Sequence, residues 1–313
     1  MELKQVPPVS ILGHIGYTGG RSRNRKNTNY KEVGLKILSR GETPPFEHYN
    51  VTFDLDGTSR YLLYLLSTSR VITITANSQR YLKVENVLDY YNNDPFVSGC
   101  LASYLLACGD NVKKEEARAL LPLASKTADL SFTTNIRELN RLYCFFEAQK
   151  NTESSELAAL LKKYLTCNDV FFSEPLPSGF YPQLTILPRL KESSPEVGTL
   201  KVTHIKTSNF MHQFVLRIPF YIWMQLIRHK SLLVEEVSIL NLYDPIVFKY
   251  LDPTMFSTKN SEDPYHILNG QYVEVSIWGP LHAWENFLRW RLEKATQPAT
   301  QKLAQAIAKE LHK

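Results

Sequence analysis

Ile227-Arg-His-Lys-Ser-Leu-Leu-Val-Glu-Glu-Val-Ser-Ile-Leu-Asn241 and Ser67-Thr-Ser-Arg-Val-Ile-Thr-Ile-Thr-Ala-Asn-Ser-Gln-Arg-Tyr81 are two damaged copies of one motif. The later copy keeps a cationic opening at residues 228–230, but it closes on leucine and asparagine at 240–241. The earlier copy has lost most of the opening and keeps its close at residues 78–81. Because the losses are complementary, we expect the two halves of the chain to contribute different parts to one site.

The size and composition of the chain favour a globular protein of two domains. Its 313 residues are enough for two domains of ordinary size. Hydrophobic residues make up 43% and aromatic residues 12%, which is typical of a packed core and not of a disordered chain. The net charge of +5 is mild, and it fits anionic ligands such as nucleotides as well as a nucleic acid.

The four cysteines suggest a reducing compartment. They form no Cys-x-x-Cys pair, no histidine stands at zinc spacing, and none of them falls inside either motif copy. We therefore expect reduced, mostly structural cysteines and no metal site. The sequence shows no apolar run of the ~18 residues that a membrane helix needs and no secretory signal at its start. These features predict a soluble, cytoplasmic protein.

A proline-rich stretch, residues 171–199, separates the two motif copies. Its density of proline and glycine is not typical of periodic structure, so we interpret it as a linker. The predicted domains are then 1–170 and 200–313.

The order of predicted elements repeats on the two sides of this linker. An alternating strand at Asn50–Asp56 precedes a helix at Gly57–Leu66 and the first motif copy. A strand at Met211–Ile218 precedes a helix at Phe220–Arg228 and the second copy.

Each side also ends in a pair of helices with apolar 3-4 spacing, predicted at 134–149 with 155–165 and at 280–293 with 300–311. We therefore predict an α+β fold of two tandem domains, each a mixed sheet with packed helices, that arose by internal duplication. Two unrelated domains that share an order of elements are the alternative.

Both motif copies offer groups that bind anions. Arg228, His229 and Lys230 follow one another at a predicted helix end, and three adjacent residues cannot all face a core. A cationic helix cap is the alternative for this run. Ser78 and Arg80 offer a hydroxyl and a guanidinium suited to a phosphate, and a strand end whose arginine pairs with a surface acid is the alternative.

The later copy resembles the signature of the flavin-dependent thymidylate synthases, the ThyX family, which reads Arg-His-Arg-x-x-Ser-x-Asn-Glu-x-Ser-x-Arg-Tyr. The matching positions are Arg228, His229, Lys230, Glu236 and Ser238 in the later copy, and Arg70, Ser78, Arg80 and Tyr81 in the earlier copy. Further segments resemble family elements: Gly34–His48, Glu115–Pro122, Asn135–Leu139, Gln225–Arg228 and Leu288–Leu292. Together these segments extend the resemblance over residues 34–165 and 211–312.

The resemblance implies an activity and an assembly. The activity is the reductive methylation of dUMP to dTMP with FAD, methylenetetrahydrofolate and NADPH. Family members are similar to one another in being homotetramers with shared sites, so two chains of this protein would form a homodimer that acts as a pseudo-tetramer.

The resemblance also implies roles for particular residues. The residues expected to bind dUMP or a related pyrimidine nucleotide are Ser78, Arg80, Arg118, Gln225, Arg228 and Arg291. Those expected to hold FAD are Arg228, His229, Lys230, Glu236, Asn135 and Arg137. In catalysis Arg291 would polarise a pyrimidine carbonyl, Ser78 would position the substrate, and His48 would lie near the folate side of the flavin. A histidine that merely satisfies the core is the alternative for His48.

The positions that have lost their family residues all belong to one kind of composite site, and the other kind keeps its residues. Leu65 and Thr68 stand where the first copy should have glutamine and arginine, and Leu240 stands where the second copy should have its closing arginine. Arg80 and Arg228 should therefore meet around a single nucleotide.

Two alternative functions stay open. Lys230 and Glu235 depart from the family signature near the flavin, so the enzyme could modify another pyrimidine nucleotide. The glycine-rich, basic segment Gly13–Lys26 would suit a non-catalytic nucleotide-binding or RNA-binding protein, although such a run is more typical of a solvated loop.

Overall fold

The structure is a computed structural model, and it describes residues 10–21, 29–126, 129–176, 181, 184–186, 194–206, 208, 210–252, 255, 263–294 and 298–311. The chain forms two compact units, each made of several chain segments. Unit 1 comprises Met1–Leu55, Ser69–Ala76 and Asp129–Ser178, and unit 2 comprises Asp56–Thr68, Asn77–Ala128 and Gly179–Lys313. These units do not follow the predicted domains, since two segments of the first half group with the second half. The sequence domains at 1–170 and 200–313 stay a prediction.

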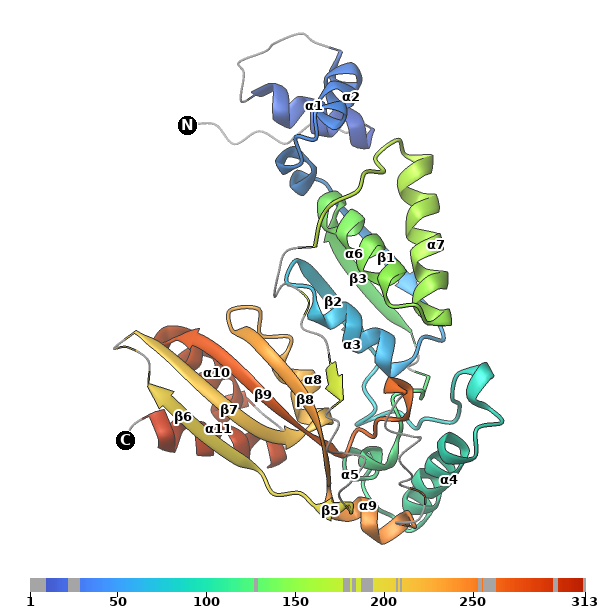
Figure 1. Ribbon diagram of the computed structural model, residues 1–313, viewed down its shortest axis with the longest axis vertical. Coiled ribbons are helices and arrows are strands. Elements are labelled where there is room, and N and C mark those ends of the chain that lie inside the picture. The colour runs from blue at the N-terminus through green and yellow to red at the C-terminus, as the bar shows by residue number, and fades with distance from the viewer. Residues whose placement is uncertain are drawn as a thin grey trace. The chain divides into compact units, whose positions relative to one another are not determined.

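Unit 1 contains a three-stranded antiparallel sheet in the order β1 (Asn50–Leu55), β3 (Leu130–Asn135), β2 (Ile72–Ala76) (Figure 1). Helix α6 (Ile136–Ala148) begins directly after β3, and α7 (Thr152–Cys167) follows it. The ring of Phe53 in β1 packs 4.9 Å from that of Tyr164 in α7, so this helix contacts the sheet.

Unit 1 begins with a close helical pair, α1 (Ile11–Arg21) and α2 (Tyr30–Ser39), followed by the 3-10 turn η1 (Pro44–His48). A Cβ at Gly16 would lie 1.8 Å from the Tyr30 carbonyl oxygen, and a Cβ at Gly34 would lie 2.2 Å from that of Leu12. The glycines thus allow the two backbones to approach closely. The expectation of a solvated loop is therefore wrong for residues 13–21, which are helical, while residues 22–26 of that segment lie outside the described residues.

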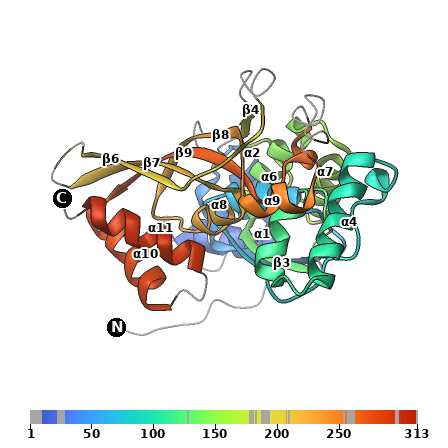
Figure 2. The ribbon, with the colours of Figure 1, turned by 90° about the horizontal axis from the view of Figure 1, so that it is seen from below.

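Unit 2 contains a six-stranded sheet in the order β4 (Leu184–Ile186), β8 (Leu233–Tyr243), β9 (Gln271–Pro280), β7 (Met211–Pro219), β6 (Lys201–Lys206), and β5 (Glu196–Val197) also pairs with β8. Helices α10 (Leu281–Lys294) and α11 (Pro298–Leu311) lie along one face of it (Figure 2). That face is the apolar one, where Phe214 of β7 packs on Trp284 of α10.

Unit 2 also contains several helices and 3-10 turns outside this sheet. They are α3 (Arg60–Thr68), η2 (Asp89–Tyr91), α4 (Pro95–Gly109), α5 (Lys114–Ala117), η3 (Arg118–Leu120), α8 (Phe220–Leu226), α9 (Pro245–Tyr250) and η7 (Pro264–His266). The β-α-β order on both sides of residues 171–199 and the paired helices are confirmed, and so is the α+β class. The linker expectation needs a correction, because β4 and β5 fall inside it and hydrogen-bond to β8.

The backbone hydrogen bonds of unit 2 occur in two matched sets. The first-turn N–H of α3, at Tyr61, donates to the Leu123 carbonyl over 3.1 Å, and the first-turn N–H of α8, at Tyr221, donates to the Asn269 carbonyl over 2.9 Å. The further matched pairs are Leu88 to Ala124 with Asp244 to Gly270, Leu121 to Arg118 with Ile267 to Pro264, and Ser125 to Pro122 with Gln271 to Leu268. Residues 118–125 and 264–271 therefore have the same local structure.

These two segments also pair with each other. An antiparallel bridge joins Pro122 to Leu268. Around it, Ala124 N–H donates to the Tyr265 carbonyl over 3.0 Å, and Gly270 N–H donates to the Ala119 carbonyl over 2.9 Å. The matched segments of the two halves are thus related by a local two-fold axis at this bridge.

Candidate functional site

The last residues of the first motif copy, 78–81, form a turn. Strand β2 ends at Ala76, and the N–H groups of Tyr81 and Leu82 both donate to the Ser78 carbonyl over 3.0 Å. The Ser78 hydroxyl accepts hydrogen bonds from the backbone N–H and the Nε of Arg80, each over 3.4 Å. Ser78 also lines a cavity of about 280 Å³, together with Lys83 and Lys126. The corresponding residues of the second copy continue strand β8 instead of turning.

Gln79 fixes this turn against the second half of the chain. Both Gln79 and Asn269 are buried, and Asn269 Nδ2 donates to Gln79 Oε1 over 3.4 Å. The Asn269 carbonyl is the group that accepts the hydrogen bond from Tyr221 at the start of α8. The turn that carries Ser78 and Arg80 is therefore held next to α8.

Arg118, which begins η3, is a buried cation beside this turn. Its side chain is 4% exposed, its Nε donates to the Glu115 carbonyl over 3.0 Å, and its guanidinium lies 4.7 Å from the centre of the Tyr221 ring. Burial lowers the pKa of Arg118 to about 10; Tyr221 and Glu115 oppose this shift, and the charge of Arg80 adds to it. Arg80 and Arg118 are therefore near enough to repel each other.

Arg60, the first residue of α3, is a second buried cation that sequence reasoning missed. It is 8% exposed, and its Nε finds no hydrogen-bond acceptor among the described residues. Burial, together with the charges of Arg228 and Arg118, lowers the pKa of Arg60 to about 9. The available signal in the sequence was an arginine that opens an otherwise apolar run, Tyr61–Leu66.

Arg60, Arg80, Arg118 and Arg228 form what we call the arginine cluster. Mutual repulsion links Arg80 to Arg118, Arg118 to Arg60, and Arg60 to Arg228. Buried guanidinium groups are stable only when an anion or hydrogen-bond acceptors compensate them. The cluster is therefore suited to a doubly charged anion such as a phosphate monoester.

The other candidates of unit 2 have varied surroundings. Arg228 is exposed, and Gln225 in α8 accepts a hydrogen bond from Thr300 of α11 over 3.2 Å. His229 packs edge-on against Phe287, with ring centres 5.2 Å apart. Lys230 Nζ donates to the Ser67 carbonyl over 2.5 Å, at the C-terminal end of α3, as expected for a cation near a helix end.

Two further candidates of unit 2 lie in the C-terminal half. Glu236 in β8 is exposed and accepts a hydrogen bond from the Ser238 hydroxyl over 3.2 Å. Arg291 belongs to α10, but its side chain lies outside the described residues.

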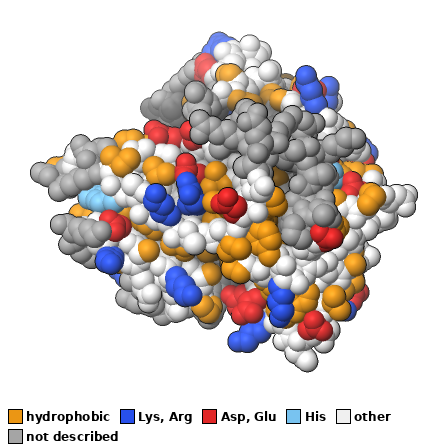
Figure 3. All heavy atoms as spheres, turned by 60° about the horizontal axis from the view of Figure 1, so that its bottom comes forward, with side chains coloured by type: hydrophobic (Ala, Val, Ile, Leu, Met, Phe, Trp, Pro, Cys, Tyr) orange, Lys and Arg blue, Asp and Glu red, His pale blue; other side chains and the backbone are white. Residues whose placement is uncertain are grey.

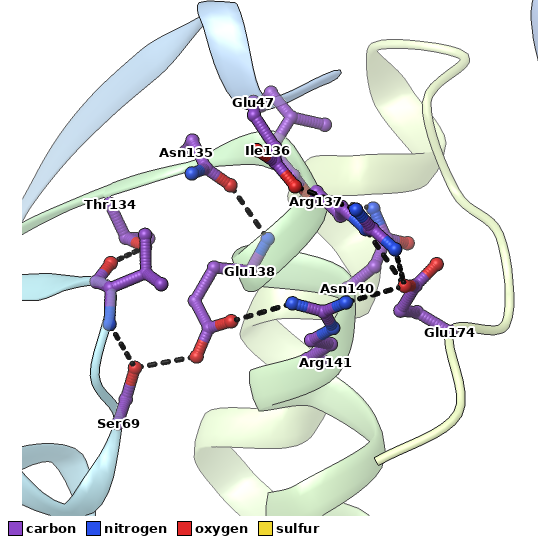
Figure 4. Close-up of polar contacts among 11 residues, drawn as sticks. Glu47, Ser69, Thr134, Asn135, Ile136, Arg137, Glu138, Asn140, Arg141 and Glu174 are labelled. Carbon is purple, nitrogen blue, oxygen red and sulfur yellow. Dashed lines mark hydrogen bonds and ion pairs between the residues drawn. The ribbon is translucent and has the colours of Figure 1, made fainter. Parts of the chain in front are cut away.

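Two candidates of unit 1, Asn135 and Arg137, lie in a network of hydrogen bonds and ion pairs (Figure 4). Asn135 caps α6, since its Oδ1 accepts from the Glu138 N–H over 2.8 Å. Arg137 donates to Glu47 over 2.6 Å and to Glu174 over 2.8 Å, and it lines a cavity of about 330 Å³. Burial lowers the pKa of Arg137, but the bonds to the two carboxylates outweigh burial and raise this pKa above its ordinary value.

His48 ends the turn η1 and is exposed. It does not satisfy the core, so that alternative is wrong. One of the buried polar residues of this unit is Glu138, which accepts a hydrogen bond from the Ser69 hydroxyl over 2.5 Å and lies 3.6 Å from Arg141.

The structure thus brings Ser78, Arg80, Arg118 and Arg228 into one unit, and it adds Arg60. Asn135, Arg137 and His48 belong to the other unit. All four cysteines are free, and the described side chains form no group of three metal ligands. Among the described helices, none has the length and apolar character to cross a membrane.

The chain is similar to proteins of known family. The family model for thymidylate synthase complementing proteins, Thy1, matches residues 11–166. The flavin-dependent thymidylate synthase of Pyrococcus furiosus is 27% identical over 158 residues, which cover 45% of this chain and 64% of the relative. That of Pyrococcus horikoshii is 29% identical over 160 residues, which cover 45% and 65%. The chain therefore matches slightly less than two thirds of the length of each relative.

Two solved structures are similar at lower identity. One is ThyX from Helicobacter pylori complexed with FAD and dUMP, with a TM-score of 0.43, 20% identity, and coverage of 52% of this chain and 94% of that one. The other is the UMP/dUMP methylase PolB from Streptomyces cacaoi bound with 5-Br dUMP, with a TM-score of 0.33, 18% identity, and coverage of 42% and 71%.

Residues 11–166 belong to the Thy1 family of thymidylate synthase complementing proteins. The family of the flavin-dependent thymidylate synthases, inferred from the two motif copies, is thereby confirmed.

Proposed function

We propose that this protein is an FAD-dependent thymidylate synthase-like enzyme that methylates dUMP to dTMP with methylenetetrahydrofolate and NADPH. The observation that carries the proposal is the arginine cluster. It includes the closing arginine of the first motif copy, Arg80, and the opening arginine of the second, Arg228, joined through Arg118 and Arg60. Such a cluster matches the phosphate of a nucleoside monophosphate by charge and by hydrogen-bonding capacity.

Within this proposal each residue has a defined role. Arg80, Arg118 and Arg228 bind the phosphate, and the Ser78 hydroxyl, which already accepts from Arg80, orients the nucleotide. Gln225, on the same helix end as Arg228, contacts the nucleotide from the second half. Arg291 polarises a pyrimidine carbonyl, which stabilises negative charge that develops on the ring. His48, which is exposed, is assigned to the folate side.

FAD supplies the redox chemistry and carries the methylene group when it is bound. In unit 2 the exposed Arg228, with His229, Lys230 and Glu236, forms the set that would hold it, and positive charge there favours an anionic reduced flavin. Asn135 and Arg137 are the candidates in unit 1. A flavin phosphate at Arg137 would compete with two carboxylates that already occupy its guanidinium, so this residue fits the cofactor less well than Arg228 does.

If the two halves of the chain derive from one ancestral domain, this explains why the proposed site combines residues from both halves. The matched hydrogen bonds at residues 118–125 and 264–271 and the repeated β-α-β order support an internal duplication. On this proposal one chain stands for two family domains, and a homodimer forms the pseudo-tetramer. Sedimentation of the purified protein at micromolar concentration should give twice the chain mass, and a mass of one chain would contradict the dimer.

The visible spectrum of the protein purified after incubation with FAD tests the enzymatic proposal. We expect flavin absorbance that stays with the protein, and NADPH oxidation that dUMP stimulates. A protein that remains colourless would remove the support for a flavoenzyme. Stimulation by UMP but not by dUMP would favour the modification of another pyrimidine nucleotide, the main alternative.

The RNA-binding alternative gains little support. On the face drawn in Figure 3, Lys and Arg side chains lie in small groups among hydrophobic and acidic ones. Nucleic-acid binding generally uses a continuous basic track. A mobility shift of single-stranded RNA that salt abolishes would revive this alternative.

A further inference from the structure

Arg60 occupies a position for which the fold provides an apolar counterpart. The backbone hydrogen bonds of Tyr61 in α3 and Tyr221 in α8 are equivalent. The residues before them, Arg60 and Phe220, therefore occupy equivalent positions as the first residues of their helices. Phe220 is fully buried, with its ring 5.3 Å from that of Tyr64. The local structure therefore accepts a large apolar side chain at this position, and a buried arginine is not required to build it.

A buried arginine at such a place costs stability unless something compensates its charge. The charged groups that act on Arg60 are Arg228 and Arg118, and both are cations. Within the described part of the chain no carboxylate lies within ion-pair distance of Arg60 or Arg118, and Glu115 is the acid that attracts Arg118 from farther away. The local charge is thus strongly positive.

The arginines of unit 1 show the opposite arrangement. Arg137 is paired with Glu47 and Glu174, and Arg141 lies 2.8 Å from Glu174 and 3.6 Å from Glu138. Those arginines stabilise the fold by pairing with buried acids. Arg60 and Arg118 have no such carboxylate partner among the described side chains. The Glu115 carbonyl and the Tyr221 ring offset part of the Arg118 charge, and an external anion would compensate the rest.

The other arginines of the cluster also lack charged counterparts in the matched half. In the register of the two motif copies Arg80 corresponds to Leu240 and Arg228 to Thr68. The matched hydrogen bonds from Leu121 to Arg118 and from Ile267 to Pro264 pair Arg118 with Pro264. For all four cations the corresponding position in the other half of the chain is therefore neutral.

We propose that Arg60 is a phosphate-binding residue of a single anion site per chain, which takes the dianionic phosphate monoester of one nucleoside 5′-monophosphate. The nucleoside part of this assignment rests on the proposed function, whereas the phosphate part rests on the arginine cluster alone. Arg60 and Arg118 supply the buried side of the site, while the exposed Arg228 supplies its open side.

Isothermal titration with dUMP, deoxyuridine and inorganic phosphate tests this proposal. We expect the wild-type protein to bind one dUMP per chain. The Arg60→Gln variant should bind dUMP about 10- to 100-fold more weakly, as for the loss of one or two charge-assisted hydrogen bonds, with little change for deoxyuridine. Arg60→Lys keeps the charge without the fork and should recover part of the affinity.

Thermal unfolding without ligand separates binding from a structural role. Removing a buried charge that two cations repel should leave the melting temperature of Arg60→Gln unchanged or higher, while the stabilisation by added phosphate or dUMP should shrink. Arg217→Gln is the matched control, because Arg217 lies in the same unit but pairs with Glu274 over 2.9 Å. It should retain the full response to dUMP.

Three outcomes would overturn the inference: an Arg60→Gln protein that binds dUMP as tightly as wild type, two dUMP molecules per chain, or a melting temperature that falls with an unchanged ligand response. The first of these would leave the proposed function intact. Conversely, phosphate binding that depends on Arg60, in a protein that binds neither dUMP nor FAD, would support the anion site and contradict the proposed function.

Discussion

The guanidinium of Arg118 lies 4.7 Å from the centre of the Tyr221 ring, and this contact joins the two halves of the chain at the candidate site. Arg118 comes from the first half and Tyr221 from the first turn of α8 in the second. The Tyr221 hydroxyl donates to Asp244 over 3.1 Å, which fixes the ring beneath the cation. The second half thus positions a cation of the first, for which we propose a role in phosphate binding.

Replacement of Tyr221 tests this positioning role. Tyr221→Leu removes the ring and should weaken dUMP binding about 3- to 30-fold, the effect of losing a cation–π contact at a desolvated site. Tyr221→Phe keeps the ring but loses the bond to Asp244, so it should weaken binding far less. Titration of both variants with dUMP decides the matter, and equal losses in the two would show that the ring face is not responsible.

The composite site predicts that one arginine from each half is needed. Arg80→Ala and Arg228→Ala should each weaken dUMP binding about 10-fold or more, since each removes charge-assisted hydrogen bonds to the phosphate. Asn241→Ala, in β8 at the close of the other motif copy, is the control and should bind normally. Fluorescence or calorimetric titration measures all three. Normal dUMP binding by Arg80→Ala would contradict a site that combines both halves.

The Arg137–Glu174 pair distinguishes a structural arginine from a flavin ligand. Arg137→Gln should lower the melting temperature, because Glu174 is 5% exposed and, among the described side chains, would keep Arg141 alone as its cationic partner. Adding Glu174→Gln should restore much of that loss. If Arg137 also holds FAD, the double variant should regain stability but still bind FAD weakly. A double variant that is no more stable than the single one would contradict the pairing argument.

The close packing of α1 and α2 predicts a steric effect at Gly16. A Cβ there would meet the Tyr30 carbonyl at 1.8 Å, so Gly16→Ala should destabilise unit 1 by about 1–3 kcal/mol through overpacking. Gly20 lies in the same helix with nothing within 4 Å of an added Cβ. Gly20→Ala should therefore be neutral or stabilising, because alanine favours helix. Thermal unfolding of the two variants should give opposite changes.

Asp94 should make stability depend on pH in the acid range. Burial raises the pKa of Asp94, but hydrogen bonds from the Val97 N–H and from His266, over 2.9 and 2.8 Å, outweigh burial and lower it. The folded pKa is below the unfolded one, so the contribution of Asp94 is complete above about pH 4 and is lost as the pH falls through the folded value.

Asp94→Asn keeps a side-chain cap for α4 but removes the charge. Its melting temperature should be lower than that of wild type at pH 5 to 7, and the difference should shrink toward pH 3. A difference of the same size at pH 3 and pH 7 would show that the Asp94 charge is not the cause.

The sequence by itself was sufficient for the family, the α+β class and most helices and strands. The strands Asn50–Leu55 and Met211–Pro219 and the paired helices that end each half were predicted because their periodicity is local. The sequence also showed that the first motif copy keeps the end of the motif, with Arg80, and that the second keeps its beginning, with Arg228. Those residues are recognised by their spacing alone.

Only the tertiary structure revealed the rest. Gly13–Arg21 is helical because glycines allow contact with α2, a partner that the local pattern does not contain. Residues 184–186 and 196–197 form strands because β8 offers an edge to pair with. Arg60 reads as an ordinary first-turn residue in the sequence, and its importance depends on burial and on two cations more than fifty residues away along the chain. Charge compensation is a property of neighbours in space, so sequence spacing could find Arg80 and Arg228, but only the fold could join them through Arg118 and Arg60.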